Sequence, residues 1–202
     1  MFHEASMVNL IECLMFHRTA CSSADDTLAE LVDYCYRQFA WLLHTMEKNP
    51  HFMAPRDAMD EFKNYSREVE IENQILEIRF KCAMGCFSII RFIAEYIDEL
   101  PTSVTYQLVE NNDIPCTLIP MLELRPWLRK NAKNEVEKWE DQAWKVVPPK
   151  DSQLVTKIEA QVWLTIYNLF LCSSAGRKYE ITSFRMDNLL RLRKFMNEVL
   201  ID

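Results

Sequence analysis

Cysteine and histidine are the residue types in this chain that can supply a nucleophile or hold a metal ion. Among the seven cysteines, Cys82 and Cys86 are the closest pair. A four-residue spacing on a helix lacks the tight turn of a Cys-x-x-Cys zinc site, and no second pair lies nearby. Both fall on the apolar line of a predicted helix, as Cys35 does on another, which favours buried structural thiols over metal ligands or nucleophiles. The other cysteines, which have no activating neighbour in the sequence, are Cys13, Cys21, Cys116 and Cys172.

A cysteine–histidine pair can still form in space, since all four histidines lie in the first quarter of the chain. They are His3, His17, His44 and His51. The chain has no Gly-x-Ser-x-Gly, His-Glu-x-x-His, Walker or Gly-x-Gly-x-x-Gly motif, and Gly85 and Gly176 are its only glycines. We therefore predict a protein that is not an enzyme and that holds no metal or cofactor within these residues. A cysteine–histidine hydrolase is the alternative.

Charge and apolar content exclude several classes of function. Thirty acidic residues against 23 basic ones give a net charge of −7, which argues against binding to nucleic acid. The densest apolar run, residues 162–172, is shorter than the roughly 20 residues of a membrane span. The N-terminus carries Glu4 where a signal peptide has positive charge. An odd number of scattered cysteines is typical of reduced thiols, so we expect a cytoplasmic protein without a transmembrane segment.

Scarce glycine favours long helices joined by short polar links. Helical spacing predicts helices over about residues 4–17, 23–46, 66–100, 103–110, 115–126, 153–172 and 186–200. The apolar lines are Met7, Leu10, Ile11 and Leu14 in the first; Leu28, Leu31, Cys35, Phe39 and Leu42 in the second; Ile75, Ile78, Cys82, Cys86, Ile89, Ile93, Ile97 and Leu100 in the third; and Leu189, Leu192, Met196 and Val199 in the last. Ser23 and Asp26 have the spacing of a capping box. The helix at 153–172 is apolar on nearly every side, so we expect it in the centre of the stack.

Four glutamates in the third helix are a candidate acid–base group. They are Glu68, Glu70, Glu72 and Glu77. Because they alternate with the apolar line of that helix, a solvated helix face is the favoured interpretation.

Two segments depart from the helical pattern. Residues 49–65, with Pro50 and Pro55, are predicted to be a variable loop. Residues 127–150 are an irregular, tryptophan-rich excursion, in which a small β-hairpin near 135–147 fits the sequence EVEKWEDQAWKVV. The sequence thus predicts one all-α domain over residues 1–202, a helical stack with one small hairpin.

Seven residues are candidate contacts for a protein partner: Trp127, Trp139, Trp144, Arg185, Arg191, Arg193 and Lys194. The basic group belongs to a charge-inverted C-terminal part and would bind an acidic surface. Its alternative is a solvated face that complements the helix dipole. The tryptophans are included because tryptophan and arginine dominate interface hot spots. Their alternative is packing on the protein's own domain.

Residues 104–124, VTYQLVENNDIPCTLIPMLEL, resemble an armadillo repeat: a helix, a short turn, an apolar-proline start and a leucine-rich helix. Armadillo repeats usually carry glycine at the position of Asp113, so the chain departs from the pattern there. The resemblance implies an armadillo- or HEAT-like stack, whose extended surface binds other proteins.

Five segments resemble, in order, the central region of a family of zinc finger MYND domain-containing proteins. They are HEASMVNLIE at 3–12, SADDTLAELVDYCYR at 23–37, PWLR at 126–129, QVWLTIYNLFL at 161–171 and ITSF at 181–184. The resemblance implies a cytoplasmic scaffold for pre-assembly of the inner and outer axonemal dynein arms, needed for motile cilia. It implies dynein subunits, chaperones and other assembly factors as partners, a co-chaperone role, and a presence at centriolar satellites or dynein axonemal particles.

The zinc-binding MYND domain of that family, with its clustered cysteines, has no counterpart in these residues. Neither zinc nor the partner contacts of that domain are therefore expected here. A non-catalytic scaffold for dynein arm assembly is the function that we expect, and an armadillo-type adaptor of another pathway is the alternative.

Overall fold

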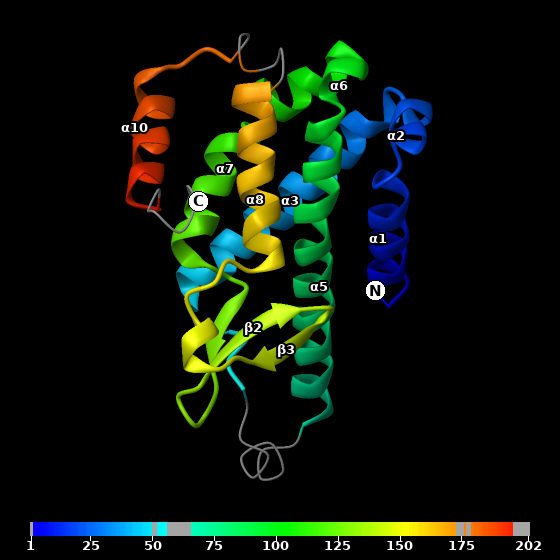
Figure 1. The fold of residues 1–202 in the computed structure, drawn as a ribbon. Helices are drawn as coiled ribbons and strands as arrows, with labels where there is room; N and C mark the ends of the chain where they lie inside the picture. Colours follow the sequence, from blue (N-terminus) through cyan, green and yellow to red (C-terminus); the bar gives the residue numbers. More distant parts are fainter. Residues whose placement is uncertain (1, 50–51, 56–65, 173–175, 177–178, 196–202) are drawn as a thin grey trace.

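The longest helix, α5 (Arg67–Glu95), packs against three other helices (Figure 1). The structure is a computed structural model that describes residues 2–49, 52–55, 66–172, 176 and 179–195. Helices α1 (Phe2–Met15), α3 (Thr27–Lys48) and α8 (Lys157–Tyr167) make the most extensive contacts with α5. The further helices are α2 (Arg18–Ala24), α6 (Thr102–Tyr106), α7 (Ile114–Leu124) and α10 (Ser183–Arg191). Short 3₁₀ or π turns cover Ile97–Glu99, Gln107–Asn111, Pro149–Asp151, Asn168–Cys172 and Leu192–Phe195.

The apolar lines predicted for the second and third helices face the core. In α5 every residue of the line from Ile78 to Ile93 is buried, and in α3 Cys35, Phe39 and Leu42 are fully buried. Aromatic stacking of Phe39 on Phe87, with ring centroids 4.6 Å apart, joins the two helices. The spacing of apolar residues therefore predicted correctly which faces of these two helices meet.

A three-stranded antiparallel sheet with the order β1-β2-β3 lies at one end of the molecule (Figure 1). The strands are β1 (Leu128–Lys130), β2 (Val136–Glu140) and β3 (Ala143–Val146). The hairpin predicted near 135–147 is confirmed as β2 and β3. Strand β1 was missed, because three residues are too few for a period to show. The protein is thus mostly helical with one small sheet, inside the segment predicted to be irregular.

Two details of the predicted helices are wrong. Ser23 lies inside α2, where its hydroxyl donates to the carbonyl of Thr19, so no capping box forms with Asp26. The helix at 153–172 is not buried all round, because Leu164 and Tyr167 of α8 are exposed. Most of the predicted loop 49–65, and the end of the last helix with Met196 and Val199, lie outside the described residues.

The predicted face of α1 is also wrong. Met7, Leu10 and Leu14 were expected in the core but are about half exposed, whereas Val8 and Met15 are buried. Helix α1 has apolar residues on two sides. It buries the side with Val8 and Met15 and exposes the side with Met7, Leu10 and Leu14. Val8 meets α5 at Gly85, where no side chain keeps the two helices apart. The same close approach shapes the groove described below.

Candidate protein-binding groove

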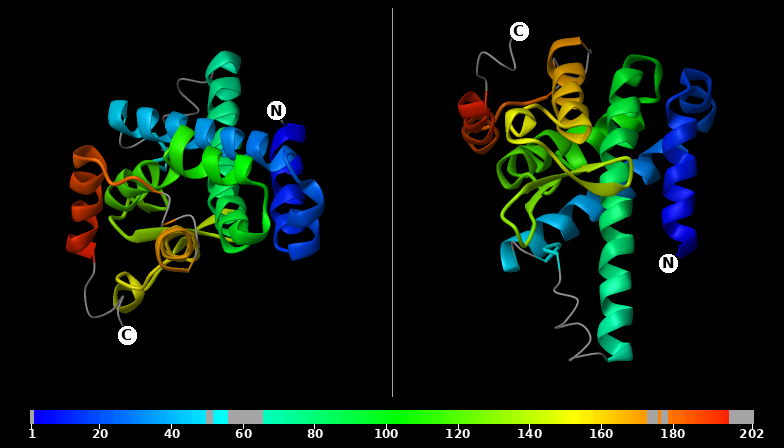
Figure 2. Two further views of the ribbon diagram at one scale, coloured as in Figure 1. Left: turned by 90° about the horizontal axis from the view of Figure 1, so that it is seen from above. Right: turned by 60° about the horizontal axis from the view of Figure 1, so that its bottom comes forward.

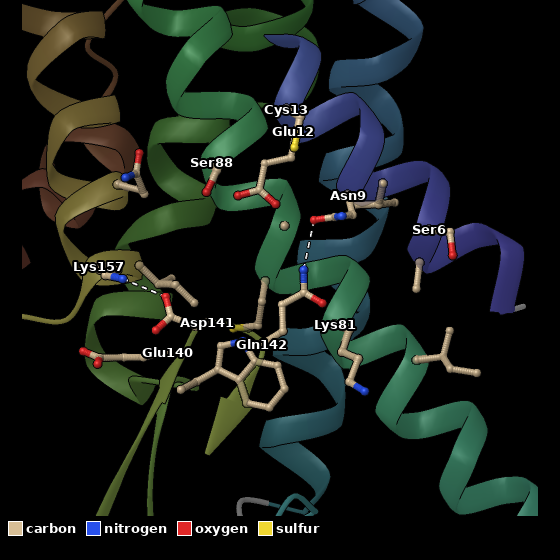
Figure 3. Close-up of a pocket in the computed structure, with 18 of the residues that line it drawn as sticks. Ser6, Asn9, Glu12, Cys13, Lys81, Ser88, Glu140, Asp141, Gln142 and Lys157 are labelled. Atoms are coloured by element: carbon tan, nitrogen blue, oxygen red, sulfur yellow. Dashed lines mark hydrogen bonds and ion pairs between the residues drawn. The ribbon is translucent and has the colours of Figure 1, made fainter. Parts of the chain in front are cut away.

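A groove of about 1100 Å³ runs between α1 and the turn that joins β2 to β3, with α5 as its floor (Figure 3). Helix α1 lines it with Val8, Asn9, Glu12, Cys13 and Phe16; α5 with Ile78, Lys81, Met84, Gly85, Ser88 and Phe92; the opposite wall with Trp139, Glu140, Asp141, Gln142, Lys157 and Gln161. Its floor is largely apolar and its rim is polar. This combination is typical of sites that bind peptide segments.

Gly85 sets how closely α1 approaches α5. A Cβ atom at this position would lie 2.8 Å from Cγ1 of Val8 and 3.5 Å from Oε2 of Glu12. The absent side chain lets α1 lie directly on the α5 backbone, and it leaves room for the Glu12 carboxylate above residue 85. A single glycine in the middle of a helix costs about 1 kcal/mol relative to alanine, so close packing of α1 is what this residue provides.

The opposite wall begins at a two-residue hairpin turn, Asp141–Gln142. Both residues have positive φ, 52° and 62°, which makes this a type I′ turn without the usual glycine. The Gln142 amide donates to Oδ1 of Asn9 on α1 at 2.9 Å, and Asp141 accepts from Nζ of Lys157 on α8 at 2.7 Å (Figure 3). The turn thus holds side chains toward α1 and α8 at the expense of backbone strain.

Glu12 is a half-buried carboxylate of the groove. Burial raises the pKa of its carboxyl, and the hydrogen bond with the Ser88 hydroxyl lowers it in part. Among the described residues no lysine or arginine pairs with it. Figure 3 shows its carboxylate beside Ser88, between α1 and α5.

The three tryptophans predicted as partner contacts attach the sheet to the helices. Trp139 and Trp144 are paired across β2 and β3, and both contact Phe80 of α5, at centroid distances of 5.1 and 5.6 Å. Trp127 is fully buried against Phe87, at 5.6 Å. The alternative interpretation, packing on the protein's own domain, describes these positions. Only Trp139 lines the groove.

Three of the four basic candidates bind their own chain. Arg185 is buried: its Nε donates to Asp113 at 2.8 Å, Nη2 to Glu110 at 3.2 Å, and its guanidinium lies 4.2 Å from the ring centroid of Tyr179. Arg191 donates to Glu123 of α7 at 3.0 Å, and Lys194 pairs with the same carboxylate. Arg193 is exposed. Whether the exposed members contact a partner stays a prediction.

Helix α10, which carries Arg185 and Arg191, is oriented with its polar side chains inward; Arg193 and Lys194 follow it in the turn Leu192–Phe195. Its buried residues are Arg185 and Asn188, whereas Phe184 and Leu190 are 66% and 60% exposed. It contacts α7, on the side of the molecule opposite α1 (Figures 1 and 2). Its attachment is therefore mainly polar.

Asp113 is the centre of that attachment and has the backbone expected of an armadillo glycine. Its φ of 40° lies in the left-handed region. Its side chain accepts from Tyr179 at 2.6 Å, from Arg185 at 2.8 Å and from the backbone N–H of Cys116 at 3.3 Å. The carboxylate thus caps α7 and anchors α10, two roles that glycine cannot fill.

Burial makes several of the thiols poor nucleophiles. Burial raises the pKa of Cys21 to about 11, and it also raises the pKa of Cys82 and Cys86. Within the described ranges, no group of three or more histidine, cysteine, aspartate or glutamate residues is placed to hold a metal ion. In the same part of the chain, no helix combines the length and apolar content needed to cross a bilayer.

The chain is 27% identical, over all 202 of its residues, to a curated relative. That relative is the zinc finger MYND domain-containing protein 10 homolog of Drosophila melanogaster. The resemblance seen in five segments is therefore confirmed and extends along the whole chain. The chain spans 43% of the length of this MYND protein homolog. No family model and no solved structure matches the chain.

The groove itself was not predicted from the sequence. Its walls come from segments that are 133 residues apart at the Asn9–Gln142 hydrogen bond. One signal did exist: Gly85 stands alone inside the longest predicted helix, and such a glycine often marks a close packing contact.

Proposed function

We propose that this chain is a non-catalytic scaffold that binds other proteins during cytoplasmic pre-assembly of axonemal dynein arms, and that it serves motile cilium assembly and movement. The groove over α5 carries the protein-binding part of the proposal, because it has an apolar floor, a polar rim and the size of a peptide segment. The resemblance to the zinc finger MYND family supports the pathway. Dynein subunits, chaperones and other assembly factors are the partners that it implies.

A non-catalytic role is supported by the state of the cysteines. Thiols whose pKa is raised by burial are mostly protonated at neutral pH and react slowly. An activity-based thiol probe should label no cysteine of the native protein faster than the same cysteine in the denatured chain. Faster labelling of one native cysteine would favour the alternative, a cysteine–histidine hydrolase. We propose likewise that the chain needs no metal ion and that its helices belong to an armadillo-like stack.

The scaffold role can be tested by co-purification from the cytosol of ciliating cells. Cys13, exposed in the groove wall, is replaced by tryptophan to fill the groove, and Ser22, exposed on α2 outside it, provides the matched control Ser22→Trp. Wild type and Ser22→Trp should recover dynein subunits or assembly factors, and Cys13→Trp should recover fewer. Recovery of none by the wild type would refute the proposal. Recovery of factors from another pathway, in cells without motile cilia, would favour the adaptor alternative.

A further inference from the structure

The shape of the groove matches a short helix. It lies between α1 and the segment formed by the hairpin turn and the start of α8, over the side chains of a third helix (Figure 3). The Gln142–Asn9 hydrogen bond joins these two walls at one point, so a bound helix must displace the Gln142 side chain. A helix about 10 Å across fills about 1100 Å³ over roughly 14 Å, which is between two and three turns. Floor residues Ile78, Met84 and Phe92 offer apolar contacts along that length. An amphipathic helix that lays its apolar face into a trough is a recurrent form of peptide recognition.

The charges of the groove are not balanced within the protein. Among the groove carboxylates, Asp141 binds Lys157, and Glu77 has Lys81 one helical turn away. Glu12 and Glu140 have no cation bound to them in the described chain. Oε2 of Glu12 lies over the bare backbone of Gly85, 3.5 Å from the point that a Cβ atom would occupy there.

Glu12 has no structural task that explains its charge. An enclosed carboxylate without a cation disfavours the folded state once it is ionised. Its contact in the folded chain is a neutral hydroxyl, that of Ser88, which a glutamine would satisfy equally well. The carboxylate lines the same groove as the strained turn Asp141–Gln142. Strain and unpaired charge in one place are typical of binding sites.

We infer that the groove binds an amphipathic helical segment of another protein, which places its apolar face on α5 and a lysine or arginine against Glu12. The inference rests on the proposed function only for the identity of that protein. It specifies the chemistry of the partner: two to three helical turns, an apolar stripe, and one basic residue within reach of residue 12.

The test is selection of peptides from a displayed library of random 16-residue sequences on the purified 202-residue chain. Each selected peptide is then checked for loss of binding when Cys13, in the groove wall, carries a bulky maleimide. Selected peptides should share an apolar stripe at helical spacing and a lysine or arginine. With Glu12→Gln their Kd should rise about 10-fold, the value of one charge-assisted hydrogen bond. With Glu12→Lys the selection should switch to peptides with aspartate or glutamate.

Circular dichroism establishes that each variant folds, and Glu12→Gln decides the matter if Glu12→Lys does not fold. Three results would overturn the inference: no peptide selected, selected peptides that ignore the Cys13 adduct, or the same charge preference on wild type and variants. If basic helical peptides are selected but ciliated-cell cytosol yields no dynein subunit, the groove chemistry stands and the proposed function fails. If ciliated-cell cytosol yields dynein subunits but no basic helical peptide is selected, this inference fails and the proposed function stands.

Discussion

Cγ1 of Val8 lies 2.8 Å from the point that a Cβ atom would occupy at Gly85, so α1 packs on the bare backbone of α5. This contact decides which face of α1 is buried. It also lowers α1 enough to bring Glu12 beside Ser88 and Asn9 within hydrogen-bonding distance of Gln142. The geometry of the groove therefore depends on one glycine.

Gly85→Ala should destabilise the protein. Alanine gains about 1 kcal/mol of helix propensity, but overpacking costs about 1–3 kcal/mol. Val8 is only 4% exposed and its β-branched side chain has few rotamers, so the clash should prevail. We expect the free energy of unfolding to fall by about 1 kcal/mol, measured by urea denaturation. Adding Val8→Ala should make the double variant more stable than the sum of the two single effects. A gain of the full helix propensity by Gly85→Ala alone would contradict the contact.

Replacing the turn Asp141–Gln142 by Asn–Gly should stabilise the hairpin and weaken peptide binding. Asn–Gly is the preferred type I′ sequence, and relief of the left-handed backbone at residue 142 is worth about 1 kcal/mol. Asp141 is lost, and Lys157 without this carboxylate repels the basic residue of the peptide. Asn134→Gly, at a turn outside the groove whose φ is 62°, is the matched control. It should leave peptide binding unchanged; unchanged binding in the Asn–Gly variant as well would separate the turn from the groove.

Glu12→Gln should raise the free energy of unfolding at neutral pH. Burial raises the pKa of Glu12 in the folded state, so the wild type loses stability as pH rises from its ordinary value of 4.5 through the raised value. Other charged groups near the groove, Lys81 on α5 and Asp141 and Lys157 opposite, are the same in both proteins. The two proteins should converge below pH 4.5, as followed by urea midpoints across a pH series.

Glu68→Gln should change the free energy of unfolding at neutral pH in the opposite direction, in the same pH series. The Ser66 hydroxyl lowers the pKa of Glu68, so this carboxylate adds stability above its ordinary pKa and loses it in acid. Glu68→Gln should therefore lower stability at neutral pH and not in acid. Equal pH profiles for the two variants would show that the surroundings of Glu12 do not resist ionisation.

Asp113→Asn should destabilise the protein by about 3 kcal/mol, because it leaves the buried guanidinium of Arg185 without its main carboxylate. Asparagine tolerates the left-handed φ of this position, so backbone strain does not contribute. Asp187→Asn, on the exposed side of α10, should change stability by less than about 0.5 kcal/mol. Thermal unfolding of both variants compares them. Equal melting temperatures would rule out the ion pair as the anchor of α10.

The parts of the fold that were predictable share a simple cause. In α3 and α5 the apolar line is long and the opposite side is charged, so one face only can be buried. Helix α1 lacks this contrast, since apolar residues occur on two of its sides and Gly85, on another helix, selects between them. Asp113 was noted as a departure from the armadillo pattern, which has glycine there, but no residue pattern indicates that its backbone has a positive φ or that its carboxylate binds Arg185.

The groove as a whole could not be predicted from the sequence, because its wall residues have no unusual pattern within their own segments. Glu12 looks like a solvated carboxylate of an amphipathic helix, and Asp141 and Gln142 look like a polar turn. Only the tertiary contacts bring them together. The tryptophans and arginines were conspicuous in the sequence for the reason that makes most of them structural: large, hydrogen-bonding side chains are also what joins a small sheet and a last helix to a core.

The inverted orientation of α10 makes its attachment responsive to ionic strength. Screening weakens the pairs of Arg191 and Lys194 with Glu123, which are partly exposed, far more than it weakens apolar contacts in the core. Salts that strengthen the hydrophobic effect favour burial of the side chains of Phe184 and Leu190, which are exposed on α10. At high salt the end of α10 at Arg191 is therefore held less tightly to α7, whereas the buried pair of Arg185 with Asp113 is screened much less and keeps the start of the helix in place.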